Sequence, residues 1–149
     1  MTKARMLAIG LAALLAFSGG ARAESGTPED AVTKWLGAMK GHEFEEAYKH
    51  ISKGMAGNKD VEAWAKEQKY IFETTDLKIF KYEVFPGKVE GEKAKVPNIL
   101  SSQDKFLNQL GADEYELYTL IKEEGAWKID QQEIVEKGDQ SPWFARKGG

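Results

Sequence analysis

The sequence contains no cysteine, and this absence excludes several classes of protein. Without cysteine the chain can form no disulfide bond, supply no thiolate nucleophile and carry no cysteine-linked lipid anchor. Histidine is almost as scarce: the two present, His42 and His50, lack the ligand spacing that is typical of a metal site. Phosphate-binding loops, dinucleotide-binding glycine patterns and Gly-x-Ser-x-Gly motifs are also missing. We therefore expect no metal, no cofactor and no recognisable set of catalytic residues.

Long apolar runs are scarce too, and the only one lies at the N-terminus. Lys3 and Arg5 precede an apolar run over residues 6–17, and Ala21-Arg22-Ala23 follows as a small-x-small cleavage site. This three-part pattern predicts a signal peptide over residues 1–23. An uncleaved membrane anchor is the alternative, but the run is shorter than the roughly 20 residues that span a bilayer. We expect a periplasmic or secreted protein with no membrane attachment after cleavage.

Excess positive charge is a third absence. The net charge of the full chain is −3, and removal of residues 1–23 takes away Lys3, Arg5 and Arg22 but no acidic residue. The remaining chain is therefore more acidic than the full one. Nucleic acids reward clustered lysine and arginine, so they are not expected as partners.

The residues that are present predict three amphipathic helices in the first half of the remaining chain. The first spans residues 28–40, with Thr27 as the N-cap and Pro28 at the first position. The second is expected over residues 43–52 and the third over residues 59–73, capped by Asn58. Each shows apolar residues at helical spacing: Ala31, Val32, Trp35, Leu36 and Met39, then Phe44, Ala47, Tyr48 and Ile51, then Val61, Trp64, Ala65, Ile71 and Phe72.

The second half has the alternation and the β-branched and aromatic residues of strands. One strand is predicted over residues 74–85 and another over residues 88–100, with a turn at Pro86-Gly87 between them. Gly91-Glu92 and Pro97 interrupt the second strand, and Pro97 suggests an edge or a bulge because proline cannot donate to a ladder. For residues 101–112 two alternatives stay open, a short helical turn or a loop that carries Phe106, Leu107 and Leu110. Helices followed by antiparallel strands indicate an α+β fold.

Residues 113–135 predict a β-hairpin that closes the domain. Tyr118 and Leu120 share one face, and Tyr115, Leu117, Thr119 and Ile121 share the other. A two-residue loop at Glu124-Gly125 would pair Leu120 with Ile129 and Lys122 with Trp127. A three-residue loop would shift this pairing by one and turn Trp127 to the opposite face.

Both ends of the remaining chain resemble NTF2-like domains, and the similarity is greatest to small exported domains of unknown function of the DUF4878 type. The resemblance rests on Thr27-Pro28-Glu29-Asp30-Ala31-Val32 with Trp35-Leu36, on the run from Gly41 to Tyr48, and on Lys122-Glu-Glu-Gly-Ala-Trp-Lys-Ile129. It implies a cone in which three N-terminal helices pack on a curved antiparallel sheet around a pocket. The expected domain covers residues 24–136, and residues 137–149 form a C-terminal tail.

The aromatic residues of this cone are the candidates for binding a ligand. They are Trp35, Tyr48, Trp64, Tyr82, Tyr118 and Trp127, and each is also a plausible core residue. We expect a non-catalytic domain that binds a small apolar ligand or an envelope protein. The alternatives are a homodimeric assembly module and a ketosteroid-isomerase-like or dehydratase-like enzyme, which would need an inward acid or base beside a tyrosine. The pair Trp143-Phe144 in the polar tail should pack back on the domain or bind a partner.

Overall fold

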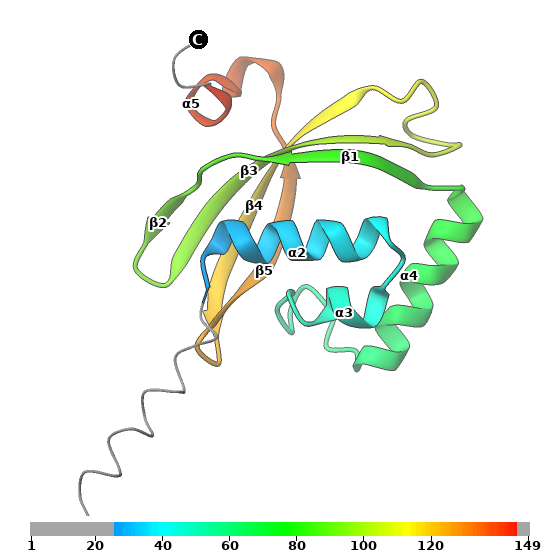
Figure 1. Ribbon diagram of the computed structural model, residues 1–149, viewed down its shortest axis with the longest axis horizontal. Coiled ribbons are helices and arrows are strands. Elements are labelled where there is room, and N and C mark those ends of the chain that lie inside the picture. The colour runs from blue at the N-terminus through cyan, green and yellow to red at the C-terminus, as the bar shows by residue number, and fades with distance from the viewer. Residues whose placement is uncertain (1–25, 146–149) are drawn as a thin grey trace, which may run out of the picture.

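The computed structural model describes residues 26–145, so the predicted signal peptide lies outside the described residues (Figure 1). A curved antiparallel sheet forms the centre, with helices on both of its faces. The elements in chain order are α2 (Pro28–Lys40), α3 (Phe44–Tyr48), α4 (Val61–Thr75), β1 (Lys78–Val84), β2 (Lys88–Glu90), β3 (Lys93–Gln103), β4 (Asp113–Glu123), β5 (Ala126–Ile134), η2 (Lys137–Asp139) and α5 (Ser141–Phe144). No helix within residues 26–145 is long and apolar enough to span a membrane.

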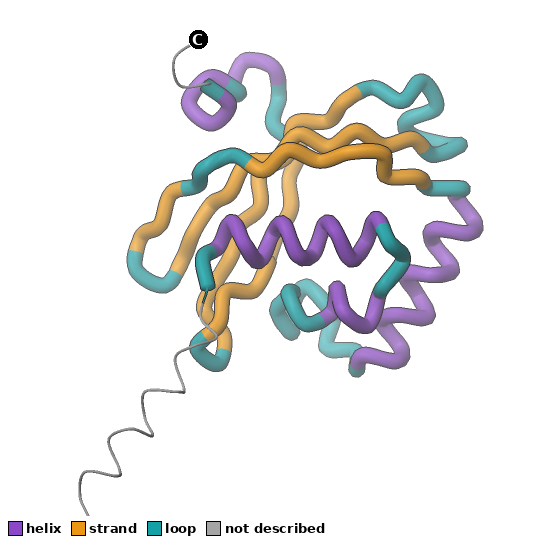
Figure 2. Tube along the Cα trace, in the orientation of Figure 1, coloured by secondary structure: helices purple, strands orange, loops and turns teal. Residues whose placement is uncertain are grey.

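The sheet has five strands in the order β1-β3-β4-β5, and β2 pairs with β3 beyond the end of β1. Figure 2 shows α2, α3 and α4 on one face of this sheet and the short C-terminal helices on the other. The predicted α+β class with a curved antiparallel sheet is confirmed. We call the face toward α2 the inner face and the other the outer face.

Helix α2 lies across the inner face and fixes the core. Its bounds match the prediction, because local signals set both ends. At the start, the Thr27 side chain accepts from the Asp30 backbone N–H, and the Asp30 side chain accepts from the Thr27 N–H. At the end, Gly41 is the C-cap, and its N–H donates to the Gly37 carbonyl. The predicted apolar stripe is buried throughout, and Val32 and Leu36 are almost inaccessible to solvent. These side chains pack against Val96, Tyr118 and Leu120 of the sheet in one apolar cluster.

Of the two loop lengths considered for the β4–β5 hairpin, two residues and three residues, the structure has the two-residue loop. Leu120 pairs with Ile129 and Lys122 with Trp127. Glu124 and Gly125 have φ values of 56° and 80°, as a two-residue turn with two left-handed positions requires. Trp127 is therefore buried on the inner face with Ile129.

Two helix predictions were wrong at their boundaries. The second helix ends at Tyr48 because the following residues bond to the sheet instead: the Ser52 N–H donates to the Ile129 carbonyl at 2.9 Å, and the Ile129 N–H donates to the His50 carbonyl at 2.8 Å. The third helix is capped by Asp60, not by Asn58, and continues to Thr75. The first strand consequently begins at Lys78.

Pro97 does not lie on an edge strand, so the first of its two predicted settings, an edge or a bulge, was wrong. It sits in β3, between β1 and β4, and pairs with Leu117. Its carbonyl accepts from the Phe85 N–H at 2.9 Å, in the break where β1 has ended and β2 has not begun. A missing N–H is tolerated there because no ladder runs opposite it.

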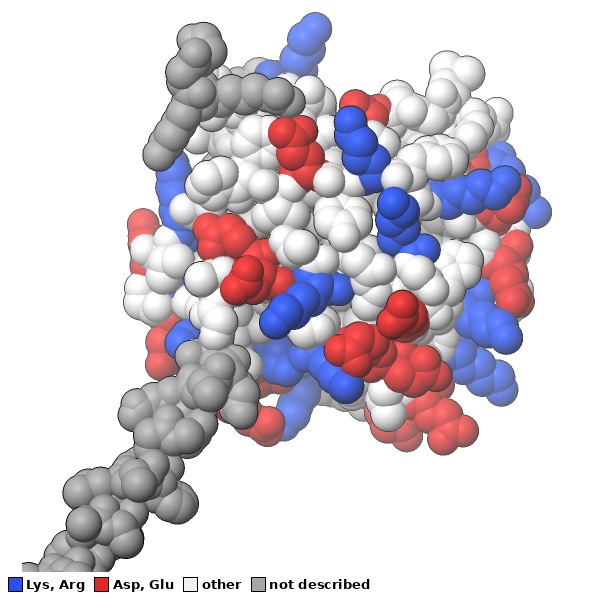
Figure 3. Space-filling view, in the orientation of Figure 1, with Lys and Arg blue, Asp and Glu red and all other residues white. Residues whose placement is uncertain are grey.

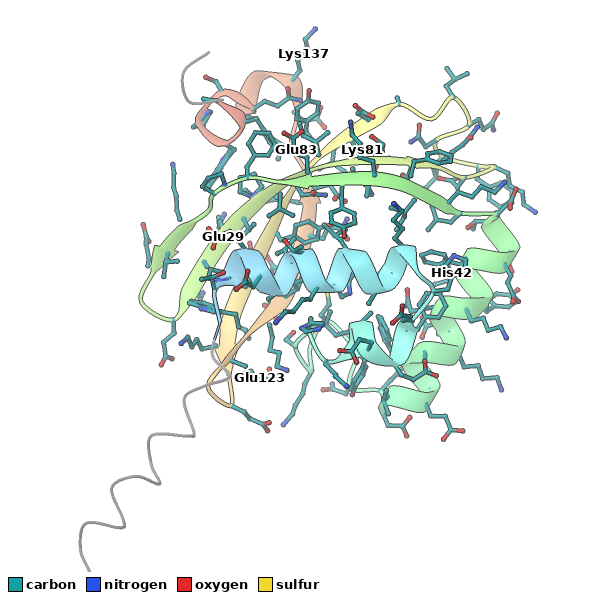
Figure 4. The ribbon with its side chains drawn as sticks, viewed as in Figure 1. Glu29, His42, Lys81, Glu83, Glu123 and Lys137 are labelled. Atoms are coloured by element: carbon teal, nitrogen blue, oxygen red, sulfur yellow. The ribbon has the colours of Figure 1, made fainter. Side chains whose placement is uncertain are left out.

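The C-terminal tail packs back on the outer face. The Phe144 ring lies edge-on to Phe85 and Tyr115, with centroids 5.4 Å and 4.9 Å away, and the Lys88 Nζ lies 4.4 Å from the Trp143 ring centroid. Lys137, at the start of the tail, is seen across the sheet from α2 (Figure 4). The tail therefore covers part of the outer face, where Leu117 is buried.

Candidate functional site: an apolar cavity beside a buried carboxylate

A cavity of about 270 Å³ lies between α2, α4 and the inner face of the sheet. Its wall is apolar and aromatic and contains no lysine, arginine, aspartate or glutamate. The lining residues are Trp35, Leu36, Met39, Met55, Trp64, Gln68, Ile71, Phe72, Leu77, Ile79, Leu100, Tyr118 and Gln132. Ile71 and Gln132 are exposed to solvent, so they mark places where the wall reaches the surface.

Three of the six predicted binding residues line this cavity. Trp35 comes from α2, Trp64 from α4 and Tyr118 from β4. Trp35 and Tyr118 meet edge to face, with ring centroids 5.7 Å apart. Both tryptophans are mostly buried, so the structure supports a core role for each as well as a place in the wall.

The other three predicted residues lie away from the cavity wall. The Tyr48 hydroxyl donates to the Lys59 carbonyl at 2.7 Å, and its ring packs on Trp64, so it supports the wall from behind. Tyr82 packs half-buried against the core near Gly37 of α2. Trp127 lies near the hairpin turn, with the Lys122 Nζ 5.1 Å from its ring centroid. Whether any of the six binds a ligand stays a prediction.

Behind the wall lies a fully buried carboxylate, Glu116 of β4. It accepts hydrogen bonds from Asn98 Nδ2 at 2.9 Å, from the Tyr118 hydroxyl at 2.7 Å and from Gln132 Nε2. Two of these donors, Tyr118 and Gln132, line the cavity. Two side chains of the cavity wall are thus hydrogen-bonded to the carboxylate.

The electrostatics of Glu116 are unusual because all its donors are neutral. Burial raises the pKa of the Glu116 carboxyl, while the hydrogen bonds from Tyr118, Asn98 and Gln132 oppose the rise. Glu114, on the same face of β4, adds a smaller upward effect on that pKa. Burial, together with the neighbouring Glu116, also raises the pKa of the Tyr118 hydroxyl well above its ordinary value. The Tyr118 hydroxyl therefore stays protonated and serves as a donor.

Glu116, Asn98 and Gln132 were missed from the sequence, whereas Tyr118 was among the predicted residues. The alternation that places Tyr118 and Leu120 on one face of β4 places Glu116 there too, so the signal was present. Asn98 could not be found in this way, because its pairing with Glu116 depends on the β3–β4 register. Two atoms at this site, Trp35 Nε1 and Asn98 Oδ1, are buried without a hydrogen-bond partner in the described structure.

Two other features of residues 26–145 have a weaker claim to function. A wider hollow of about 510 Å³ between α3 and α4 is open and charged, with Glu45, Glu62, Lys66 and Lys69 on its rim. His42 beside it packs on Phe44 and Phe72, at the corner that follows α2 (Figure 4). His50 is half-buried after the end of α3, and burial lowers its pKa. No group of three potential metal ligands occurs in the described residues.

Comparison with known proteins shows the fold and no more. No family model and no curated protein matches the chain. A domain of unknown function with a cystatin-like fold from Nostoc punctiforme matches with a TM-score of 0.53 and 15% identity, over 82% of this chain and 78% of that one. This likeness shows an overall fold shared with that domain.

Two further structures are more distant. An NTF2-like protein of unknown function from Cytophaga hutchinsonii matches with a TM-score of 0.44 and 16% identity, over 80% of this chain and 96% of that one. Bd1075 of Bdellovibrio bacteriovorus matches with a TM-score of 0.49 and 14% identity, over 70% of this chain. The chain spans only 38% of the length of Bd1075.

Proposed function

We propose that this chain is an exported, non-catalytic domain of the NTF2-like type, and that its cavity holds a small apolar molecule. Helices α2, α3 and α4 would be the three helices of an NTF2-like cone, and the site of action would be the periplasm or the outside of the cell. The observation that carries the proposal is the cavity between α2, α4 and the sheet, with four aromatic side chains in an uncharged wall. Its volume of about 270 Å³ lies just below the lower end of the range for ligand pockets, so the ligand is small.

Variants at the exposed part of the wall test this proposal. Ile71 on α4 lines the cavity and is 38% exposed, whereas Tyr70 beside it is 68% exposed and does not line the cavity. We expect Ile71→Trp to obstruct the cavity and weaken binding of small neutral apolar compounds by about tenfold. Tyr70→Trp should leave binding unchanged. Quenching of tryptophan fluorescence and the thermal shift of unfolding measure both.

The charge of the ligand is a second test of the same proposal. The wall has no cation, and the Glu116 carboxylate lies behind it, so an anionic ligand would lose hydration without gaining a partner. Acetophenone, a neutral ketone, should therefore raise the unfolding temperature more than benzoate of similar size. A preference for benzoate, or no shift with any compound of this size, would contradict the proposal.

Export has its own test. The predicted cleavage after Ala23 would leave Glu24 as the first residue. N-terminal sequencing of the protein recovered from the periplasm or the medium should read Glu24-Ser25. Recovery only from the cytoplasm, with the leader intact, would overturn the localisation.

A second candidate function is proton transfer, and Glu116 is the observation that favours it. A buried carboxyl with a raised pKa beside a tyrosine donor is typical of sites that move protons. The Tyr118 hydroxyl, however, donates to Glu116, so it must turn before it can bond a substrate. Isomerase or dehydratase activity that disappears in Glu116→Gln, while neutral ligands still bind, would favour this function over simple binding.

A further inference from the structure

The loop between β3 and β4, residues 104–112, holds three large apolar side chains in solvent. Leu107 is 93% exposed, Leu110 95% and Phe106 59%. We call these three residues the apolar tip. Figure 3 shows uncharged atoms projecting at the upper right of the molecule, where Figure 1 draws this loop in yellow. Such large apolar side chains gathered on one projecting loop are typical of an interaction site.

The backbone beneath the apolar tip is fixed by hydrogen bonds. Asp104 Oδ1 accepts from the Phe106 and Leu107 N–H groups at 2.7 and 2.6 Å. Asn108 is buried; it donates to the Ser102 and Ala112 carbonyls and accepts from the Ala112 N–H. The Lys105 N–H donates to the Thr75 carbonyl at the end of α4. The loop is thus held from both sides with its apolar side chains outward, and binding would cost little ordering of the chain.

The size of the apolar tip argues against a protein partner held by this loop alone. An aromatic side chain buries roughly 150–250 Å². The three side chains together therefore offer roughly 400 Å², about half of the roughly 800 Å² that each partner buries in a stable protein interface. A bilayer interface, by contrast, takes up single apolar side chains without a matching pocket.

The charges around the loop are of both signs. Lys78 and Lys105 lie at its base together with Asp76 and Asp104, and their side chains line one polar hollow there. Asp113 follows the loop and accepts from the Ser101 hydroxyl. The charges of this loop therefore favour neither an anionic nor a cationic surface, and its apolar side chains are what it offers for an interaction.

In place of the expectation from the sequence that the cleaved protein has no membrane attachment, we propose that the apolar tip inserts into a lipid bilayer and holds the protein reversibly on a membrane surface. The inserted side chains are Phe106, Leu107 and Leu110, and the polar base of the loop stays at headgroup level. This binding is independent of the proposed cavity ligand, because the cavity lining does not include the loop. It should persist at high ionic strength and require no anionic lipid.

The absence of cysteine makes a site-specific test possible. Leu110→Cys, labelled with an environment-sensitive fluorophore, reports on the apolar tip alone. On vesicles of phosphatidylcholine and phosphatidylethanolamine, we expect a blue shift and quenching by acyl-chain quenchers, unchanged by phosphatidylglycerol or by raised salt. Val89→Cys, an apolar position that is 52% exposed on β2, is the control and should stay in water. This control also accounts for any vesicle binding by residues 1–23.

A second pair of changes separates insertion from other contacts. Phe106→Ser with Leu107→Ser, in the labelled protein, should reduce vesicle partitioning of the 110 label by at least about tenfold. Both side chains are exposed, so the fold should not change. A label that stays in water at every vesicle concentration overturns the proposal. So does a blue shift that appears without vesicles and grows with protein concentration, because that result would mean contact with a second copy.

Discussion

At the scale of single residues, Glu116 is the most informative side chain. It is buried between two strands, it has three neutral donors, and within the described structure no basic side chain forms a salt bridge with it. Burying a charge without a counter-charge costs stability, which a protein bears where the group has a function or a specific structural task. Replacing the Glu116 carboxylate with an uncharged amide therefore tests what its charge contributes to stability.

Glu116→Gln should change how stability depends on pH. The folded-state pKa of Glu116 is raised, so the unfolded chain releases this proton at lower pH than the folded protein does. The contribution of Glu116 to the wild-type free energy of unfolding should therefore be greatest below about pH 4.5. This contribution should fall as the pH rises through the folded-state pKa of Glu116. Glu116→Gln removes this fall, so the variant should gain stability relative to wild type as the pH rises above about 4.5.

Urea unfolding at several pH values measures the effect. Glu133→Gln is a suitable control, because Glu133 lies on β5 but is exposed. Parallel curves of unfolding free energy against pH for wild type and Glu116→Gln would show that the raised pKa is wrong.

At the scale of elements, the break between β1 and β2 joins the sheet to α2. The Gly87 N–H in this break donates to Glu29 Oε2 at 2.7 Å, and Figure 4 shows Glu29 at the start of α2. A Cβ at position 87 would lie 2.3 Å from the Lys95 carbonyl oxygen and 2.9 Å from Val96 Cγ2. Backbone cannot move aside as a flexible side chain can, so the close approach requires glycine.

Gly87→Ala should therefore destabilise the fold by about 1–3 kcal/mol. Gly138→Ala is the matched control, since a Cβ there meets nothing within 4 Å and should change stability little. Thermal unfolding followed by circular dichroism compares the two. Equal melting temperatures would mean that the β1–β2 break rearranges without cost.

The elements also show where sequence patterns succeed. Helix α2 was predicted to the residue because its capping box and apolar stripe are local. The end of α3 was missed because Ile51 pairs with Ile129, which lies far along the chain. Trp35, Trp64 and Tyr118 were found as wall residues because aromatics on an apolar stripe face inward. Glu116 was missed because only the pairing of β4 with β3 and β5 brings up Asn98 and Gln132, the donors that make burial tolerable.

At the scale of the whole molecule, the tail decides what the outer face of the sheet can contact. Phe144 packs on Phe85 and Tyr115, and both Phe85 and Leu117 are buried. A homodimer through the outer face, one of the expected alternatives, would have to displace this tail or go around it.

Phe144→Ala should loosen the tail and uncover the outer face. Loss of two edge-on ring contacts should cost about 1–2 kcal/mol, and hydrogen exchange should rise over residues 137–145. If the uncovered face is self-complementary, a concentration-dependent dimer should appear by light scattering. Phe106→Ala, which removes an exposed ring elsewhere, is the control. Unchanged exchange in Phe144→Ala would show that the ring contacts do not hold the tail.

The parallel bridge between Ile51 and Ile129 also limits when the N-terminal helices can reach their native packing during synthesis. The segment after α3 has its hydrogen-bonding partner in the last strand, and α2 shares one core cluster with residues of β1, β3, β4 and β5. During synthesis, the earliest helices must wait for nearly the entire polypeptide before their native neighbours exist. If the proposed export takes place during synthesis, the chain would therefore cross the membrane before these native contacts could form.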